Sequence, residues 1–182
     1  MPTLSIESAL IIAVPEAEPL VKSLREQFDS SAAVGVPAHV TILYPFKPPH
    51  EITSVVQAEL RQLFAPFAAF EFALVELRRF PQAQVMYLAP SPAAPFQALT
   101  QAVYERYPDT PPYGGAFAEI TPHLTLVDAG EPDRLDAIER DFTRLYGGQL
   151  PVRARASEVL LIDNTSGRWE VRQTFRLVDH LR

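Results

Sequence analysis

The chain has 182 residues, a formal net charge of −6, 47% hydrophobic residues and no cysteine. This length suits one domain, or two small lobes that share a core, and we expect a single unit over residues 1–182. The absence of cysteine excludes disulfides, thiolate nucleophiles, iron–sulfur clusters and zinc ribbons. Because tight binding to long nucleic acid depends on many neutralised phosphates, the acidic charge argues against a long polyanion as ligand.

The first third of the chain predicts strands and helices in alternation. Residues 8–14 form a continuous apolar run typical of a central strand. This run is too short for a signal peptide or a membrane span, so we expect a cytoplasmic protein without a membrane segment. Residues 15–28 predict a helix, because acidic residues fill its first turn and leucines recur on one face. A loop over residues 29–37 and a second helix over residues 51–64 follow.

The remainder of the chain predicts hairpins and further helices. Two hairpins are expected, formed by residues 70–80 with 84–89 and by residues 151–162 with 168–178. Helices are expected over residues 95–107 and 132–146, and a long loop rich in Pro and Gly over residues 108–122. Interleaved helices and hairpins indicate an α+β fold with mixed or antiparallel sheets.

One tetrapeptide pattern occurs twice, as His39-Val40-Thr41-Ile42 and as His123-Leu124-Thr125-Leu126. Alternation with period two is typical of a strand, on which residues i and i+2 project from the same face. Each histidine therefore lies beside its threonine, while the branched apolar residues point the other way into packing. A proline precedes each histidine closely, so the two segments are expected at equivalent places of a duplicated architecture.

Three segments carry a resemblance to a known family: residues 39–46 (His-Val-Thr-Ile-Leu-Tyr-Pro-Phe), 112–117 (Pro-Tyr-Gly-Gly-Ala-Phe) and 122–126 (Pro-His-Leu-Thr-Leu). The chain resembles the two-histidine (2H) phosphoesterase superfamily, in particular its bacterial 2′,5′ RNA ligase and cyclic phosphodiesterase branch. Both tetrapeptides satisfy the family pattern of His, an apolar residue, Thr or Ser, and an apolar residue. The resemblance implies two pseudo-symmetric lobes, each with one motif, whose antiparallel sheets face a central cleft with helices outside.

The resemblance also implies an activity. The expected enzyme is a metal-independent phosphoesterase that hydrolyses 2′,3′-cyclic phosphates or 2′,5′ phosphodiester linkages, with RNA ligation as the reverse reaction. His39 and His123 are the expected acid–base pair, since imidazole changes charge near neutral pH, and their two roles are interchangeable at this level. Thr41 and Thr125 are expected to donate hydrogen bonds to phosphate oxygens. The expected partner is an RNA end or a small nucleotide with a 2′,3′-cyclic phosphate.

No metal or cofactor is expected. A histidine-only zinc site generally needs three protein ligands, whereas each motif offers one imidazole and a threonine, which is a poor ligand. The segment Tyr113-Gly114-Gly115 is not a P-loop, because no lysine follows it at the required place.

Aromatic residues near the motifs are candidate substrate-binding residues. Tyr44, Phe46 and Tyr113 are placed to stack on a base or to close the cleft, and core packing is the alternative for each. Trp169 alternates with apolar residues in the last predicted strand and is expected in the core.

Two other functional classes stay open. The first is a non-catalytic module of the same fold that binds an RNA end or a cyclic nucleotide, although such a module has no need of an acid–base pair. The second is a nucleotide-modifying enzyme of another type with a coincidental motif, which metal-dependent activity would reveal. A monomer is expected.

Overall fold

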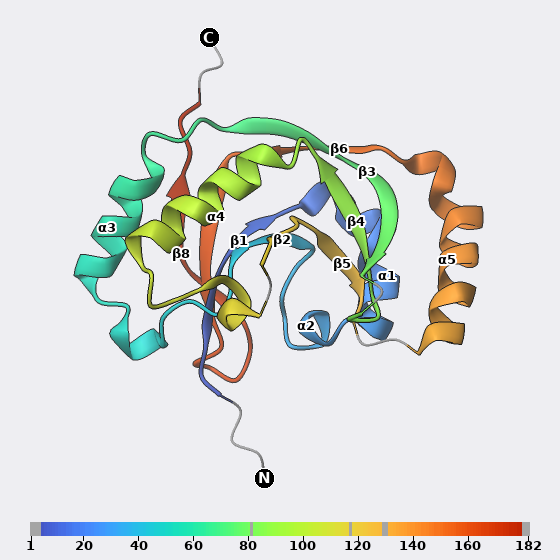
Figure 1. The fold of residues 1–182 in the computed structure, drawn as a ribbon, viewed down its shortest axis with the longest axis horizontal. Helices are drawn as coiled ribbons and strands as arrows, with labels where there is room; N and C mark the ends of the chain where they lie inside the picture. The colour runs from blue at the N-terminus through green and yellow to red at the C-terminus, as the bar shows by residue number, and fades with distance from the viewer. Residues whose placement is uncertain (1–4, 81, 117, 129–130, 180–182) are drawn as a thin grey trace.

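The computed structural model describes residues 5–80, 82–116, 118–128 and 131–179, which form two antiparallel four-stranded sheets surrounded by helices (Figure 1). The first sheet has the strand order β2-β1-β7-β8 and the second β5-β4-β3-β6. The strands are β1 (Ser8–Ala13), β2 (His39–Leu43), β3 (Phe70–Phe80), β4 (Val85–Ser91), β5 (Leu124–Val127), β6 (Val152–Ala156), β7 (Glu158–Asp163) and β8 (Glu170–Arg176). The predicted α+β class with antiparallel sheets is confirmed. Pro81 of the first predicted hairpin turn and Phe117 of the second resemblance segment lie outside the described residues.

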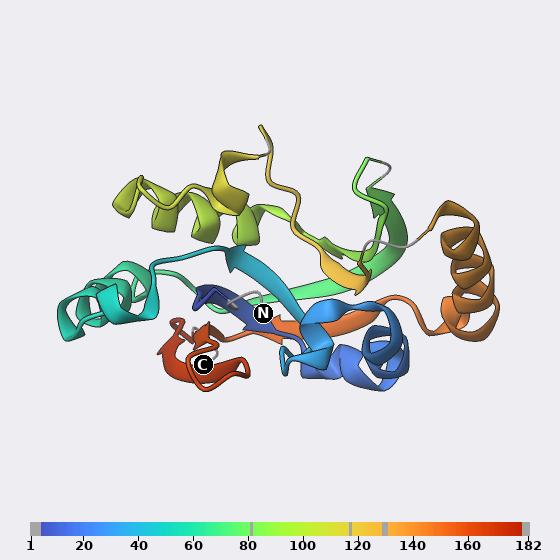
Figure 2. The ribbon, with the colours of Figure 1, turned by 90° about the horizontal axis from the view of Figure 1, so that it is seen from below.

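The helices flank these sheets, and α3 and α5 lie at opposite ends of the long axis (Figures 1 and 2). They are α1 (Glu18–Phe28), α2 (Ser30–Ala33), α3 (Ser54–Phe64), α4 (Ala94–Arg106) and α5 (Pro132–Tyr146), with short 3₁₀ turns η1 (Pro15–Ala17), η2 (Pro49–Glu51), η3 (Pro112–Gly115) and η4 (Gly147–Gln149). Helix α5 has the predicted bounds, since Leu135, Ile138 and Phe142 recur at helical spacing and are buried. Among the described helices, none combines the length and apolarity needed to cross a bilayer.

The two halves of the chain repeat one arrangement. In each sheet the motif strand, β2 or β5, lies at the edge and pairs with the strand that precedes it in the chain, β1 or β4. Helix α4 of the second half packs against β2 of the first half. Helix α1 of the first half packs against β5 of the second half. Both motif strands are thereby covered by an element that the opposite half supplies.

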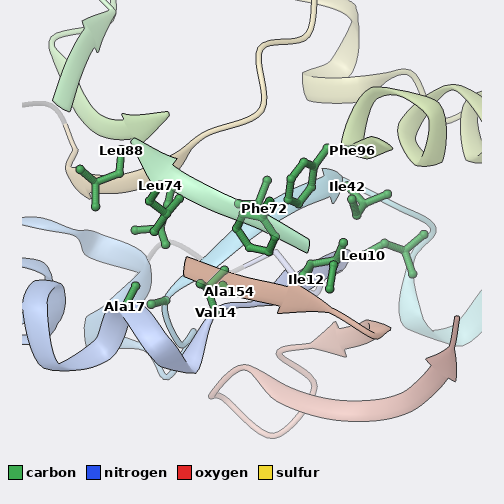
Figure 3. Packing of buried hydrophobic residues seen from close by; sticks show 14 of the residues in the cluster. Leu10, Ile12, Val14, Ala17, Ile42, Phe72, Leu74, Leu88, Phe96 and Ala154 are labelled. Atoms are coloured by element: carbon green, nitrogen blue, oxygen red, sulfur yellow. The ribbon is translucent and has the colours of Figure 1, made fainter. Parts of the chain in front are cut away.

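Both sheets share one hydrophobic core. Val40 and Ile42 of β2 and Leu124 and Leu126 of β5 are all at most 1% exposed and belong to one buried cluster with residues of both sheets. Figure 3 shows side chains of β1 and β3 meeting in this cluster. Burial of such side chains is the main stabilising contribution to a fold, so the motif strands are held by the best-packed part of the molecule.

The predicted strand over residues 151–162 is wrong in one respect: it is two strands that belong to different sheets. Val152–Ala156 pairs with β3, whereas Glu158–Asp163 pairs with β1 on one side and β8 on the other. The apolar pattern changes at the same point. It alternates in the edge strand β6, which has one exposed face, and becomes continuous in the inner strand β7.

The predicted loop over residues 29–37 contains the short helix α2. Asp29 caps this helix, since its carboxylate accepts hydrogen bonds from the backbone N–H of Ser31 at 3.0 Å and from the Ser31 hydroxyl at 2.7 Å. Side-chain caps of this kind stabilise a first helical turn that has too few hydrogen bonds of its own.

A buried hydroxyl joins α4 to the motif strand β2. The Thr100 hydroxyl donates to the Ile42 carbonyl at 2.7 Å, and Thr100 is 5% exposed. We expect Thr100→Val to lower the free energy of unfolding by about 1–3 kcal/mol, because it leaves a buried carbonyl without its partner. Denaturant unfolding checks this, with the same substitution at the exposed helical Thr143 as control. Equal effects of the two substitutions on the free energy of unfolding would show that this hydrogen bond does not stabilise the fold.

Candidate active site

The two motifs meet in one cavity of about 670 Å³, here called the central cavity. His39, Thr41, His123 and Thr125 all line it. Their alternation with buried neighbours directs these four side chains to the cavity, as the period-two pattern predicts. Within the described residues, no group of three or more His, Asp or Glu side chains is arranged to hold a metal ion.

The two histidines share the same hydrogen-bonding arrangement. Nδ1 of His39 lies 2.8 Å from the Pro37 carbonyl oxygen, and Nδ1 of His123 lies 2.7 Å from the Thr121 carbonyl oxygen. A carbonyl oxygen only accepts, so Nδ1 carries the hydrogen in both rings. Nε2 is then the unprotonated nitrogen of each neutral imidazole, and it is the atom available for proton transfer in the central cavity.

Burial lowers the pKa of both histidines. At His39, desolvation outweighs the hydrogen bond to Pro37 and, with help from the positive charge of Arg25, lowers the pKa to about 4. Desolvation also lowers the pKa of His123 against the opposing hydrogen bond to Thr121. Both imidazoles are therefore neutral at neutral pH while the cavity holds no anion.

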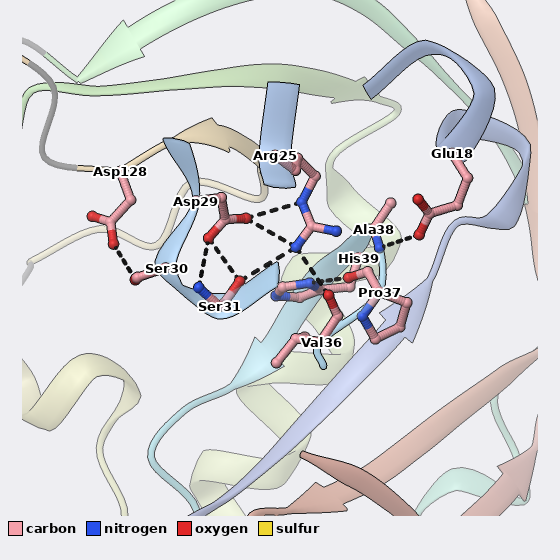
Figure 4. Close-up of polar contacts among 10 residues, drawn as sticks. All are labelled: Glu18, Arg25, Asp29, Ser30, Ser31, Val36, Pro37, Ala38, His39 and Asp128. Carbon is pink, nitrogen blue, oxygen red and sulfur yellow. Dashed lines mark hydrogen bonds and ion pairs between the residues drawn. The ribbon is translucent and has the colours of Figure 1, made fainter. Parts of the chain in front are cut away.

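A buried ion pair holds the segment that precedes His39 (Figure 4). Arg25 of α1 donates through Nε to the Asp29 carboxylate at 2.9 Å, and both side chains are 3% exposed. The same guanidinium donates to the Val36 carbonyl at 3.2 Å. The Ala38 N–H donates to the Glu18 carboxylate at 2.7 Å, so α1 holds both ends of the short segment that leads into the first motif.

The sequence matches the 2′-5′ RNA ligase superfamily over residues 13–168. The chain belongs to this superfamily. No curated protein matches the chain in a sequence search.

Solved structures of similar fold cover nearly the whole chain. E. coli LigT complexed with 3′-AMP has a TM-score of 0.62 and 14% identity, over 95% of this chain and 98% of LigT. The protein TT0787 of Thermus thermophilus has a TM-score of 0.60 and 18% identity, over 96% of this chain and all (100%) of TT0787. A phosphoesterase structure has a TM-score of 0.57 and 15% identity, over 95% of this chain and 99% of that chain. At these identities the likeness concerns the fold.

Tyr113 links the two halves of the candidate site. Its backbone has the left-handed φ of 50°, and the two glycines that follow also have positive φ, so η3 turns sharply at the cavity. Its N–H donates to the Tyr44 carbonyl at 2.6 Å, and its side chain hydrogen-bonds Thr41. Its ring stacks on His123 at 6.3 Å between centroids. Tyr113 thus contacts one motif through its hydroxyl and the other through its ring.

Tyr44 lies at the junction of the central cavity and an adjoining cavity of about 510 Å³, here called the side cavity. Its hydroxyl donates to the Glu7 carboxylate at 2.6 Å, and its ring makes an edge contact with Trp169. Trp169, which its pattern predicts in the core, packs partly buried against a second apolar cluster and also lines the side cavity, as His39 does. Glycine at position 35, with φ of 104°, lets the backbone pass this tryptophan closely, since a Cβ there would lie 3.2 Å from the Trp169 carbonyl.

Phe46 does not reach the cavity. It is 5% exposed, belongs to the shared core and makes an edge contact with the ring of Tyr107. Phe46 therefore packs in the core, the alternative to substrate binding, and its N–H donates to the Ser8 carbonyl of β1 at 2.9 Å.

Two of the cavity residues that the sequence pattern does not single out are joined by a hydrogen bond. Ser30 of α2 donates to the Asp128 carboxylate at 2.6 Å, and both line the central and side cavities. Asp128 directly follows the second motif strand, and this position could have predicted it as a cavity residue. The sequence offers no such signal for Ser30, because 98 residues separate it from its partner.

The lowered pKa of His39 predicts a pH dependence of stability. The unfolded chain binds a proton near the ordinary histidine pKa, whereas the folded chain does so only near pH 4, so stability is lost as pH falls between these values. We expect His39 to account for at most about 3 kcal/mol of this loss.

Denaturant unfolding from pH 7 to pH 4 measures the effect. His39→Gln should flatten the dependence, whereas His50→Gln, at an exposed position, should leave the slope unchanged. An unaltered slope in His39→Gln would show that burial of this imidazole does not disfavour its charge.

Proposed function

We propose that this chain is a phosphoesterase that hydrolyses 2′,3′-cyclic phosphates or 2′,5′ phosphodiester linkages of RNA ends or nucleotides, without a metal ion. The observation that carries the proposal is the matched pair of histidines, each with Nδ1 bound to a carbonyl and Nε2 left for the central cavity. A threonine from each motif lines the same cavity. A neutral binding site needs no such pair of titratable groups, so the arrangement favours catalysis over simple recognition.

In the proposed reaction, one imidazole removes a proton from water and the other donates a proton to the leaving ribose oxygen. The water oxygen attacks phosphorus, the bond from phosphorus to that ribose oxygen breaks, and a phosphomonoester and a free hydroxyl result. The hydroxyls of Thr41 and Thr125 donate to the nonbridging oxygens as negative charge builds there. The same groups serve ligation, in which a ribose hydroxyl replaces water as nucleophile.

We assign His39 as the base and His123 as the acid in the hydrolytic direction. His39 has a pKa of about 4, mainly because burial disfavours its charged form. His123 lies among the rings of Phe80, Tyr87 and Tyr113, at 5.0, 5.5 and 6.3 Å between centroids. The contacts with Phe80 and Tyr87 are edge contacts, whereas Tyr113 stacks on the imidazole, and an aromatic face supports the imidazolium form that an acid needs.

The proposed substrate class has support from the superfamily and from the contents of the cavity. The structure of similar fold with 3′-AMP describes a LigT that binds a nucleotide. In this chain, Tyr44, Phe80 and Tyr113 line the central cavity, and aromatic rings stack on nucleobases. A nucleotide phosphate between the motifs would leave its base within reach of these rings.

Incubation with a panel of nucleoside 2′,3′-cyclic phosphates in excess chelator, followed by identification of the products, tests the proposal. We expect turnover to a nucleoside monophosphate. Each single variant, His39→Ala or His123→Ala, should lower kcat/KM by about 10²–10⁴-fold, and the double variant should be scarcely worse because the two act as a unit. Activity that vanishes with chelator and returns with a divalent ion would refute metal independence. Binding without turnover would instead favour the non-catalytic module.

The pH profile tests the assignment of roles. Because kcat/KM reports the free enzyme, the lowered pKa values of both histidines place its maximum on the acidic side of neutrality, between about 4 and the ordinary histidine pKa of 6.5. A bound phosphate anion raises the pKa of both imidazoles, so the alkaline limb of kcat should lie at higher pH than that of kcat/KM. The acidic limb reports protonation of the base, so it should be lost in His39→Ala. If it is lost in His123→Ala and kept in His39→Ala, the assignment is reversed.

The threonines should act mainly in the transition state. We expect Thr41→Val and Thr125→Val, which remove the hydroxyl and keep the branched shape, to lower kcat by about 10²-fold with a smaller change in KM. Steady-state kinetics measure this, and Thr143→Val on the outer helix α5 is the control. Full turnover in either cavity variant would restrict that threonine to a structural role.

A further inference from the structure

The charged side chains around the proposed site are acidic. Asp29, Glu119 and Asp128 line the central cavity, and Glu7 and Asp128 line the side cavity. Within the described ranges, neither cavity has a lysine or an arginine in its lining. The phosphate of a ligand would therefore meet two imidazoles, hydroxyls and backbone groups, with no permanent cation.

Arg25, the cation that acts on the pKa of His39, is already neutralised. Arg25 contributes to the lowered pKa of His39, but it is buried and paired with Asp29 at 2.9 Å. Asp29 in turn raises that pKa and so offsets part of the effect of Arg25. This ion pair leaves no net positive charge for a substrate.

The described hydrogen-bond donors to the remaining three acids are neutral groups. Asp128 accepts from the Ser30 hydroxyl, and Glu7 accepts from the hydroxyls of Tyr44 and Ser5. These donors are neutral, and the described part of the chain contains no ion pair of Glu7, Glu119 or Asp128. Clefts lined by charge of one sign focus the field and repel ligands of that sign.

The side cavity suits an uncharged group. Trp169 and Tyr44 lie at its wall with the aliphatic side chains of Ile11, Val36 and Ile162. It opens beside His39 and Thr41, which it shares with the central cavity. A ligand with its phosphate between the motifs can therefore place a neutral, flat group against Trp169 without burying a second charge.

Resting on the proposed function, we infer that the site selects compact monoanions, namely nucleoside 2′,3′-cyclic phosphates without further phosphate groups, over RNA ends and other polyanions. A cyclic phosphodiester carries one negative charge, which one imidazolium balances. An additional phosphate on the same ligand adds charge near Glu7, Glu119 and Asp128, and neither cavity lining has a lysine or an arginine to offset it. Hydrolysis converts the monoanion into a phosphomonoester with nearly two negative charges, so the same repulsion favours release of the product.

The test compares three substrates that share one nucleoside: the 2′,3′-cyclic phosphate, its 5′-phosphorylated form, and a short oligonucleotide that ends in it. At low ionic strength we expect kcat/KM for the two phosphorylated substrates to be lower by about tenfold or more. Raising the salt to about 0.5 M should recover several-fold of this loss, since the Debye length falls to a few ångströms, and should change the simple cyclic nucleotide little.

Charge-neutral variants separate repulsion from steric exclusion. Asp128→Asn and Glu119→Gln should raise kcat/KM for the 5′-phosphorylated substrate relative to the simple one by about threefold or more each, by removal of one like charge. Asp141→Asn changes the formal charge equally on the outer helix α5, where Asp141 is 66% exposed, and should leave the ratio unchanged.

The outcomes distinguish this inference from the proposed function. Turnover of the oligonucleotide or the 5′-phosphorylated form as fast as the simple cyclic nucleotide at low salt overturns the inference and leaves the proposed function standing. A penalty that neither salt nor the two cavity variants relieve also overturns it, because the exclusion is then steric. Absence of turnover with every cyclic phosphate, in low and high salt, defeats both.

Discussion

The site depends on the burial of four branched side chains, Val40, Ile42, Leu124 and Leu126, in the core that the two sheets share. Because strand side chains alternate, a shift of either strand by one residue would bury the histidine and threonine and expose the apolar pair. Such a shift has a high cost in a shared core, so packing fixes the direction of the polar groups. Helices α4 and α1, each from the opposite half, complete this restraint at the two sheet edges.

Much of this arrangement could be predicted from local pattern. The repeated tetrapeptides predict strands with polar groups on one face, and α5 follows from its apolar spacing with no error in its bounds. Where the sequence misleads, the decisive interaction is long-range. Residues 151–162 read as one strand because Val152, Val159 and Ile162 favour extended backbone and no glycine or proline lies between them, and only pairing with β3 and β1 divides them between the sheets.

The same distinction applies to the site. The local alternating pattern predicts the cavity positions of the two motif histidines and threonines. Contacts between segments distant in the chain bring three other residues to the cavities: Glu7, Ser30 and Trp169. Tyr113 and Phe46 show why proximity in sequence is insufficient for aromatic residues. The left-handed turn at η3 brings Tyr113 onto His123, and the chain after β2 turns Phe46 away into the core.

Burial and charge act together on the protons of the site. Desolvation holds both imidazoles neutral in the free protein, and the acidic surroundings supply no cation to receive an anion. A phosphate that enters the cavity is the missing counter-charge for an imidazolium, so it raises the histidine pKa and promotes uptake of a proton at Nε2. In the proposed mechanism, the charged acid then forms where the substrate is already bound. In an empty cavity, desolvation disfavours this imidazolium. Binding of the monoanion and uptake of the proton that the proposed acid needs are therefore coupled.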